Sequence, residues 1–215
     1  MRTYVQLENT KSFDLPEKFQ DDDVRYTESL VDYFLQAFTQ VNDVVFDPFA
    51  GFGTTLFVAE KLGRIPFGIE YDQERAGYIQ SKLKQSGTII HGDSRQLLSY
   101  DLPAINFSMT SPPYMTKDGI ENPFTAYTTN GDGYTGYLKD IRNIYEQIGQ
   151  LMAFDAKAVI EVANIRHGDK LTTLAWDIAR EVSKVLHFEG EVVICWDRYG
   201  GGYDHSYCLI FSKRA

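Results

Sequence analysis

Two short segments of the chain combine residue types that suit ligand binding and group transfer. Residues 47–55 read Asp-Pro-Phe-Ala-Gly-Phe-Gly-Thr-Thr, and residues 110–114 read Thr-Ser-Pro-Pro-Tyr. A glycine-containing turn lets the backbone approach a ligand closely, because glycine has no Cβ and tolerates positive φ. The hydroxyl, prolines and aromatic ring of the second segment suit the binding of an amino group. We therefore expect a nucleotide-cofactor cradle at the first segment and an amino-group site at the second.

The glycine spacing of the first segment narrows the class of cofactor. Gly51 and Gly53 lack the third glycine of a dinucleotide fingerprint, and no Gly-Lys-Ser/Thr sequence follows them. Neither a pyrophosphate nor a triphosphate is therefore favoured. A cofactor with an uncharged linkage at the turn and a ribose further out fits better, and S-adenosylmethionine is the natural candidate.

The second segment has the features that amino-group chemistry needs. Pro112 and Pro113 fix φ and remove two amide donors, so we expect a rigid turn whose carbonyls face outward. An exocyclic amino group needs acceptors for its two hydrogens, and the Ser111 Oγ and the Pro112 carbonyl can supply them. Tyr114 offers a flat surface on which a base can stack. The structural alternative is a simple proline turn after a strand.

The two segments also resemble the motifs of a known family. Residues 47–55 closely resemble the cofactor loop of amino-methylating (N4-cytosine/N6-adenine) DNA methyltransferases, and residues 110–114 are similar to their catalytic loop. The resemblance implies S-adenosylmethionine-dependent transfer of a methyl group to a base amino group. It assigns catalysis to Ser111, Pro112, Pro113 and Tyr114. It assigns cofactor binding in the first loop to Asp47, Pro48, Phe49, Ala50, Gly51, Gly53, Thr54 and Thr55.

An acidic residue extends the cofactor site beyond the glycine loop. Glu70 ends the apolar run 67–70, one strand, helix and strand further along the chain. An acid at this place can accept hydrogen bonds from both ribose hydroxyls. Tyr71 follows it as a further cofactor contact, whereas Asp72 competes as the N-cap of the helix expected at 73–84.

Two further cofactor contacts are implied by the resemblance, and each has a structural alternative. Asp93, with Ser94 beside it, resembles the family's contact to the adenine amino group, but Asp93 can instead cap the helix that follows. Thr27 lies in a segment that resembles the one touching the methionine end of the cofactor. It can equally cap the amphipathic helix expected to end at Phe38.

Apolar runs that alternate with helical patterns indicate how these residues are positioned. Strands are expected at 41–46, 67–70, 87–93, 104–109, 157–164, 191–196 and 207–212. The pattern predicts an α/β fold in which ligands bind at the carboxyl ends of parallel strands. The last two strands, around residues 199–203, would form an antiparallel hairpin. We expect a Rossmann-like class I methyltransferase fold with a seven-stranded, mostly parallel sheet.

Length and composition bound the domain organisation. The 215 residues, of which 43% are hydrophobic, fit one domain. We expect an irregular N-terminal arm at 1–24, with a solvated acidic run at 21–23. A single methyltransferase domain at 25–215 would follow it, without the separate target-recognition domain of some relatives, in several of which the two loops also come in reverse order. The segment 115–137, rich in Thr, Tyr, Gly and Asn, is expected to be a lid over the target pocket or a flexible loop.

Charge and rare residues exclude some classes of partner. The net charge of −9 opposes a large basic nucleic-acid surface but is compatible with a local one. Cys195, Cys208 and four scattered histidines predict no disulfide framework and no metal site. No apolar run is long enough for a membrane span and no signal segment is evident, so we expect a cytoplasmic protein without a membrane partner.

The sequence leaves several functional alternatives open. Nucleic acid is the expected partner, DNA before RNA, and Ser111 favours cytosine N4 over adenine N6, for which the family more often has Asp or Asn. An RNA base methyltransferase, or a non-catalytic subunit that keeps the fold, would share the same motifs. Sequence specificity could come from 115–137 or from a partner subunit, and a homodimer is also compatible. The resemblance implies restriction-modification as one biological setting, beside gene regulation and RNA modification.

Overall fold

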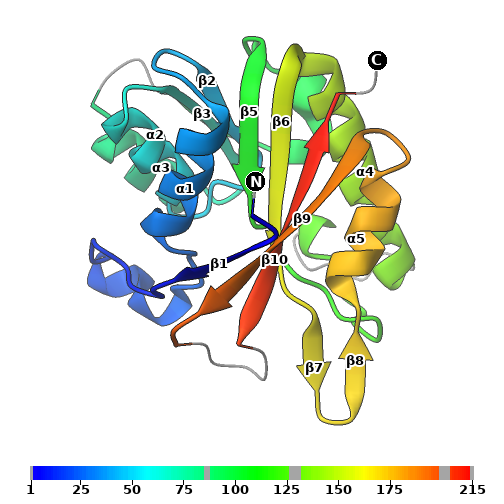
Figure 1. Cartoon of the computed structure of the whole chain (residues 1–215). Helices are drawn as coiled ribbons and strands as arrows, with labels where there is room; N and C mark the ends of the chain where they lie inside the picture. Colours follow the sequence, from blue (N-terminus) through cyan, green and yellow to red (C-terminus); the bar gives the residue numbers. More distant parts are fainter. Residues whose placement is uncertain (1, 85–87, 126–131, 199–203, 214–215) are drawn as a thin grey trace.

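A mostly parallel sheet forms the centre of the molecule (Figure 1). The computed structural model describes residues 2–84, 88–125, 132–198 and 204–213. These residues form an eight-stranded sheet in the order β1-β9-β10-β6-β5-β2-β3-β4. Neighbouring strands pair in parallel, except that β10 is antiparallel to both β9 and β6. The strands are β1 (Tyr4–Leu7), β2 (Val44–Asp47), β3 (Ile65–Glu70), β4 (Thr88–His91), β5 (Ile105–Thr110), β6 (Met152–Val162), β9 (His187–Trp196) and β10 (His205–Ser212).

Seven of these strands correspond to the predicted ones, and β1 is an addition. The sequence predicts an irregular arm here, but Tyr4–Leu7 pairs in parallel with β9, with Tyr4 opposite Val193 and Leu7 opposite Trp196. A four-residue segment carries little periodicity of its own. It becomes a strand because β9 would otherwise present an open edge of unpaired backbone groups, which is a property of the tertiary structure.

Side chains alternate along the strands and divide the core into two layers. Phe46 and Ala158 belong to the layer that packs against α4 and α5, whereas Val45 and Val159 belong to the layer that packs against α1 and α2. Figure 1 shows α1, α2 and α3 on one side of the view and α4 and α5 on the other. The helices are α1 (Glu28–Phe38), α2 (Thr54–Lys61), α3 (Gln73–Lys82), α4 (Gly133–Leu151) and α5 (Leu174–Val182), with 3-10 helices η1 (Glu17–Asp22), η2 (Ser94–Ser99) and η3 (Pro123–Thr125).

The segment between β1 and α1 packs on the glycine loop. Leu15 and Phe19 are 4% and 7% exposed. The Phe19 ring lies 5.2 Å from the ring of Phe52, centroid to centroid, and Phe52 belongs to the loop 47–55. Phe13 packs edge-on against Phe57 of α2. The arm therefore packs against the glycine loop, the predicted cofactor-binding segment, and supports it.

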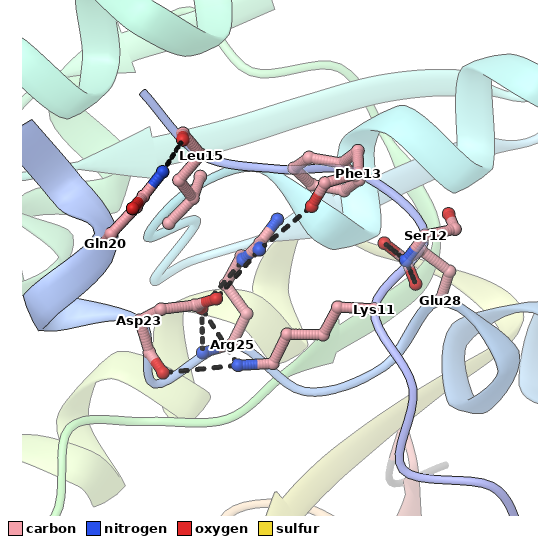
Figure 2. A network of polar contacts seen from close by, with 8 residues as sticks. All are labelled: Lys11, Ser12, Phe13, Leu15, Gln20, Asp23, Arg25 and Glu28. Carbon is pink, nitrogen blue, oxygen red and sulfur yellow. Dashed lines mark hydrogen bonds and ion pairs between the residues drawn. The ribbon is translucent and has the colours of Figure 1, made fainter. Parts of the chain in front are cut away.

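Polar contacts fix the path of the arm (Figure 2). Arg25 donates to both carboxylate oxygens of Asp23 at 2.8 Å, and Lys11 Nζ lies 3.0 Å from Asp23 Oδ1. Burial raises the pKa of Asp23, but the hydrogen bonds from Arg25 and Lys11 outweigh it and hold this pKa well below its usual range. Glu28, at the start of α1, accepts the Ser12 amide. The prediction of a solvated acidic run is therefore wrong for Asp23, which is ion-paired.

A small hairpin extends from the end of β6. Its strands β7 (Ile165–His167) and β8 (Lys170–Thr172) form a separate antiparallel pair (Figure 1). Helix α4 begins at Gly133, earlier than the predicted start at 137. The predicted turn at 199–203 and the central part of the predicted lid, 126–131, lie outside the described residues. Among the helices that the structure describes, none is both long and apolar enough to cross a membrane.

Candidate active site

The carboxyl ends of neighbouring strands bring the predicted site residues to one edge of the sheet. Asp47 ends β2 and Glu70 ends β3. Asp93 follows β4, and Ser111 follows β5. Because these strands are parallel neighbours in the order β5-β2-β3-β4, the glycine loop and the loop 110–114 lie at the same edge.

Asp47 organises the start of the glycine loop. Its side chain is buried, its Oδ1 accepts the Phe49 amide at 3.0 Å, and its Oδ2 accepts the Tyr26 hydroxyl at 3.4 Å. Tyr26 also makes a short hydrogen bond with the Thr55 hydroxyl. Burial raises the pKa of Asp47 to about 6, although the hydrogen bonds from the Phe49 amide and the Tyr26 hydroxyl oppose the shift. Asp47 thus links the loop to α2 and to the segment before α1.

The two glycines are required by the backbone of the turn. Gly51 and Gly53 have φ of 56° and 86°, in the left-handed region that disfavours side chains. A Cβ at Gly53 would lie 2.9 Å from the Phe57 ring and 3.0 Å from Ile79. The Gly53 amide donates to the Ala50 carbonyl at 2.7 Å and closes the turn. Gly53 is therefore required by packing against Phe57 and Ile79, whereas Gly51 leaves a bare backbone where a ligand could approach.

Glu70 is built into the same turn. Its Oε2 accepts the Gly51 amide at 2.7 Å, and its Oε1 accepts the Asp72 amide at 2.8 Å. Glu70 is 8% exposed, and burial raises its pKa although the two amides lower it. Each carboxylate oxygen retains a lone pair for a further donor. Asp72 caps α3 by accepting the Arg75 amide at 2.9 Å, which is its predicted structural role.

Asp93 and Ser94 have partners within the chain. Asp93 caps η2 by accepting the Arg95 amide at 2.9 Å, and the Arg95 guanidinium lies 2.7 Å from its Oδ2. The predicted cap is therefore present, and contact with an adenine amino group stays a prediction. Ser94 is buried, and its hydroxyl donates to the Pro48 carbonyl in a short hydrogen bond. Ser94 thus fastens the glycine loop to the end of β4.

Thr27 and Tyr71 differ in their accessibility. Thr27 is fully buried and caps α1, with its Oγ1 accepting the Leu30 amide at 3.4 Å. The predicted cap is present, and a contact with the methionine end of a cofactor stays a prediction. Tyr71 follows β3 and is 58% exposed, so its ring is available to a ligand.

A hydrogen bond from helix α4 holds the loop 110–114 in place. The Tyr137 hydroxyl, which is buried, donates to the Pro113 carbonyl at 2.9 Å. The expectation that the carbonyls of this turn face outward is therefore wrong for Pro113, whose carbonyl is bound inside the protein. Pro112 is buried, and Ser111 is half-buried beside it.

The Tyr114 hydroxyl is held by two hydrogen bonds, and its side chain is partly exposed. The hydroxyl donates to Glu161 Oε2 at 3.4 Å and accepts the Ala163 amide at 2.8 Å. The side chain is 38% exposed. A ring fixed at one end and exposed on its surface suits stacking with an unpaired base.

Sequence reasoning missed two residues of this region. Glu161 lies in β6, and the only sequence signal is an acid within an apolar run. Tyr26, one residue before Thr27, bonds Asp47 and Thr55, and nothing in its local sequence indicates this. Asn164, two residues after β6, accepts the Ala175 amide at 3.1 Å at the start of α5.

Comparison with known sequences finds similarity to one family. Residues 8–81, which contain most of the packed arm, Asp47, the glycine turn and Glu70, match the family profile described as DNA methylase, the N6/N4 methyltransferases. This segment of the chain is therefore similar to the N6/N4 DNA methylases. The chain is also 40% identical over 50 residues to the type II methyltransferase M.BglII of Bacillus subtilis. That similarity covers 23% of this chain and 14% of the relative.

Comparison with solved structures confirms the class I methyltransferase fold of the chain. TrmN from Thermus thermophilus superposes with a TM-score of 0.64 at 16% identity, over 92% of this chain and 52% of TrmN. A TehB-like SAM-dependent methyltransferase from Corynebacterium glutamicum superposes with a TM-score of 0.59 at 13% identity, over 92% of this chain and 93% of that chain. The chain thus spans about half of TrmN and a small part of M.BglII.

The geometry of the glycine loop fits S-adenosylmethionine, the cofactor that the fold implies. Gly51 has no side chain to exclude a ligand, and Glu70 presents a carboxylate at the end of β3. Within the described residues, no group of three or more His, Cys, Asp or Glu side chains is arranged to hold a metal ion.

A groove in the described part of the chain lies away from this site. It has a volume of about 860 Å³ and lies between the arm and helices α1 and α2. Its lining includes Phe13, Glu28 and Phe57 and none of the predicted cofactor or catalytic residues.

Proposed function

We propose that this chain is an S-adenosylmethionine-dependent methyltransferase that acts on an exocyclic amino group of a nucleic-acid base, cytosine N4 or adenine N6 in DNA. The observation that carries the proposal is the position of the loop 110–114 beside the glycine loop at one sheet edge. The match of residues 8–81 to the DNA methylase profile supports DNA as the substrate. Ser111 in place of Asp or Asn favours cytosine N4.

The cofactor would be held by the glycine loop and by the acids that follow β3 and β4. Glu70 would accept hydrogen bonds from the ribose hydroxyls with the lone pairs that the Gly51 and Asp72 amides leave free. Asp93 would accept from the adenine amino group, and Thr27 would lie near the methionine end. Bound S-adenosylmethionine would supply a methyl group on a sulfonium, which is already an activated electrophile.

The residues of the catalytic loop would position the amino group. The Ser111 Oγ and the Pro112 carbonyl would accept its two hydrogens, so that the nitrogen lone pair turns towards the methyl group. The target base would leave its stack and lie against the Tyr114 ring, which is exposed and anchored by Ala163. A strong general base is unnecessary, because positioning alone can change the rate by about 10²-fold per ångström.

The proposal includes an organisation of the chain. Residues 1–24 are treated as an arm that buttresses the cofactor loop, and residues 25–215 as one methyltransferase domain. Sequence specificity would come from the segment 115–137 or from a partner subunit. A non-catalytic subunit would have no need of the anchored Tyr114 ring or the strained glycine turn.

Methyl transfer from labelled S-adenosylmethionine tests the proposal directly. The protein is incubated with duplex DNA, single-stranded DNA and RNA, and the nucleosides are then analysed by mass spectrometry. We expect N4-methylcytosine or N6-methyladenine from DNA, with much slower incorporation of the label by Ser111→Ala. Methylation of RNA alone would replace the DNA substrate, and cofactor binding without any transfer would favour a non-catalytic subunit.

A further inference from the structure

A buried carboxylate, that of Glu161 in β6, lies next to the catalytic loop. Glu161 is 7% exposed, and its Oε2 accepts the Tyr114 hydroxyl at 3.4 Å. Thr110 of β5 pairs with Ile160 of β6, so that Ser111 follows β5 at the level of Glu161. The hydroxyls of Ser111 and Ser206 act as further donors that lower the pKa of Glu161. Its strand, β6, lies between β10, which carries Ser206, and β5, which leads into Ser111. One carboxylate therefore connects three strands at the proposed target pocket.

Neighbouring N–H groups fix the direction of two of these hydrogen bonds. The Tyr114 oxygen accepts the Ala163 amide at 2.8 Å, and the Ser206 Oγ accepts the indole N–H of Trp196 at 3.1 Å. Each hydroxyl keeps its own proton to donate, and an ionised carboxylate can only accept. Glu161 is therefore the acceptor for both.

The same reasoning fixes the direction of the third bond. An ionised Glu161 has no proton to give, so the Ser111 hydroxyl donates to it. The lone pairs of Ser111 then remain available for a hydrogen of the target amino group. Without Glu161 as acceptor, the Ser111 proton could rotate into the pocket and oppose the amino hydrogens.

We propose that Glu161 is a positioning residue for methyl transfer, which holds the Ser111 hydroxyl with its lone pairs towards the amino group and holds the Tyr114 ring at the pocket wall. The inference rests on the proposed function and deepens it. It also accounts for an acid between Ile160 and Val162, both of which are fully buried. A buried carboxylate costs free energy unless donors surround it, and here three hydroxyls do so.

A double-mutant cycle tests whether Glu161 acts through Ser111. Glu161→Gln keeps the shape but places N–H donors in the group, so the Ser111 hydroxyl loses its fixed direction. We expect the single-turnover transfer rate of Glu161→Gln to fall roughly 10- to 100-fold, with unchanged cofactor affinity and thermal midpoint. The double variant with Ser111→Ala should lose much less than the two single losses combined, because Glu161 acts mainly through Ser111 and only in part through Tyr114. Additive losses would overturn the inference.

Ser206→Ala provides the matched control. It removes a hydrogen bond to the same carboxylate from β10, on the other side of β6 from Ser111. We expect its transfer rate to stay close to that of the wild type. A fall as large as that of Glu161→Gln would show that loosening the buried carboxylate is sufficient, and would overturn the positioning role. Glu161→Asp, which keeps the charge, should recover part of the rate.

An NMR titration tests for the Ser111–Glu161 contact without measuring activity. Glutamate δ-carbons are labelled with ¹³C, and the Glu161 signal is assigned with Glu161→Gln. Burial raises the pKa of Glu161 and the Ser111 hydroxyl lowers it, so Ser111→Ala should raise this pKa further. An unchanged pKa would overturn the contact.

The neighbouring titratable groups do not interfere with this measurement of the Glu161 pKa. Tyr26 and Cys208 sense the Glu161 charge, and burial raises the pKa of each well above its usual value, so both stay neutral through the titration. Burial also raises the pKa values of Asp47 and Glu70, so these groups can titrate in the same pH range as Glu161. Aspartate is unlabelled, however, and the Glu70 signal is identified in Glu70→Gln. Absence of transfer by the wild-type protein would overturn the proposed function together with this role, whereas an active wild type with an unchanged Glu161 pKa would overturn the inference alone.

Discussion

Glu70 accepts the Gly51 amide at 2.7 Å, so the residue proposed to bind the ribose also shapes the turn that would carry the cofactor. The two roles use different lone pairs of one carboxylate. Binding and loop geometry are therefore coupled through a single side chain, and a substitution there affects both.

Glu70→Ala should weaken S-adenosylmethionine binding. Loss of charge-assisted hydrogen bonds corresponds to about 1.5–3 kcal/mol, and the unpaired Gly51 amide adds to it. Glu70→Gln keeps an acceptor for that amide and should weaken binding less. Calorimetric titration measures both, with Glu74→Ala, an exposed acid on α3, as the control. Wild-type affinity in a folded Glu70→Ala protein would remove Glu70 from the site.

Gly53→Ala should lower stability, because φ is 86° and the new Cβ would lie 2.9 Å from the Phe57 ring. A left-handed non-glycine residue costs roughly 1–2 kcal/mol before any clash. Gly77→Ala is the matched control, since nothing lies within 4 Å of its Cβ in helix α3. It should stabilise the protein by about 1 kcal/mol. Urea unfolding measures both, and equal effects of the two substitutions would contradict the strained turn.

Asp47 should make the folded state less stable as pH rises. Its pKa is raised from 3.8 to about 6, so between these values the folded state binds more protons than the unfolded state. Stability must then fall with increasing pH across this window, by about 3 kcal/mol at most for this group. Unfolding free energies of the wild type and Asp47→Asn, measured from pH 4 to 7, should converge or cross as the wild type loses stability. Parallel curves would show that Asp47 has an ordinary pKa.

Tyr114→Ala should weaken binding to single-stranded DNA by about 1–3 kcal/mol, because a stacking surface is lost. Tyr114→Phe keeps the ring and removes the hydrogen bonds to Glu161 and Ala163. It should bind DNA nearly as well while transferring methyl groups more slowly. Fluorescence anisotropy measures binding, and cofactor affinity should be unchanged in both variants. If Tyr114→Ala bound DNA like the wild type, the ring would not be a stacking platform.

Local sequence was sufficient to predict the α/β class, the positions of seven strands of the sheet and the two loops. Alternation of apolar runs and helices, with Gly51 and Gly53 after a strand, is a local pattern that needs no knowledge of distant contacts. The caps by Thr27, Asp72 and Asp93 were likewise predicted alternatives, because a cap involves residues only a few positions apart.

The features that were missed depend on distant parts of the chain. β1 is a strand only because β9 offers an edge, and Asp23 is ion-paired only because Lys11 and Arg25 fold back onto it. Glu161 becomes part of the site through Ser111 and Ser206, which lie on other strands or loops. Sequence spacing carries no record of such contacts.

The comparison of the wild type with Ser111→Ala in single-turnover methyl transfer tests the central claim most directly. The account predicts methylated cytosine or adenine nucleosides with the wild type, a rate lower by about 10²-fold in Ser111→Ala because the amino group is misplaced, and equal cofactor affinity in both proteins. A correctly folded Ser111→Ala protein that transfers methyl groups at the wild-type rate would contradict amino methylation at this site.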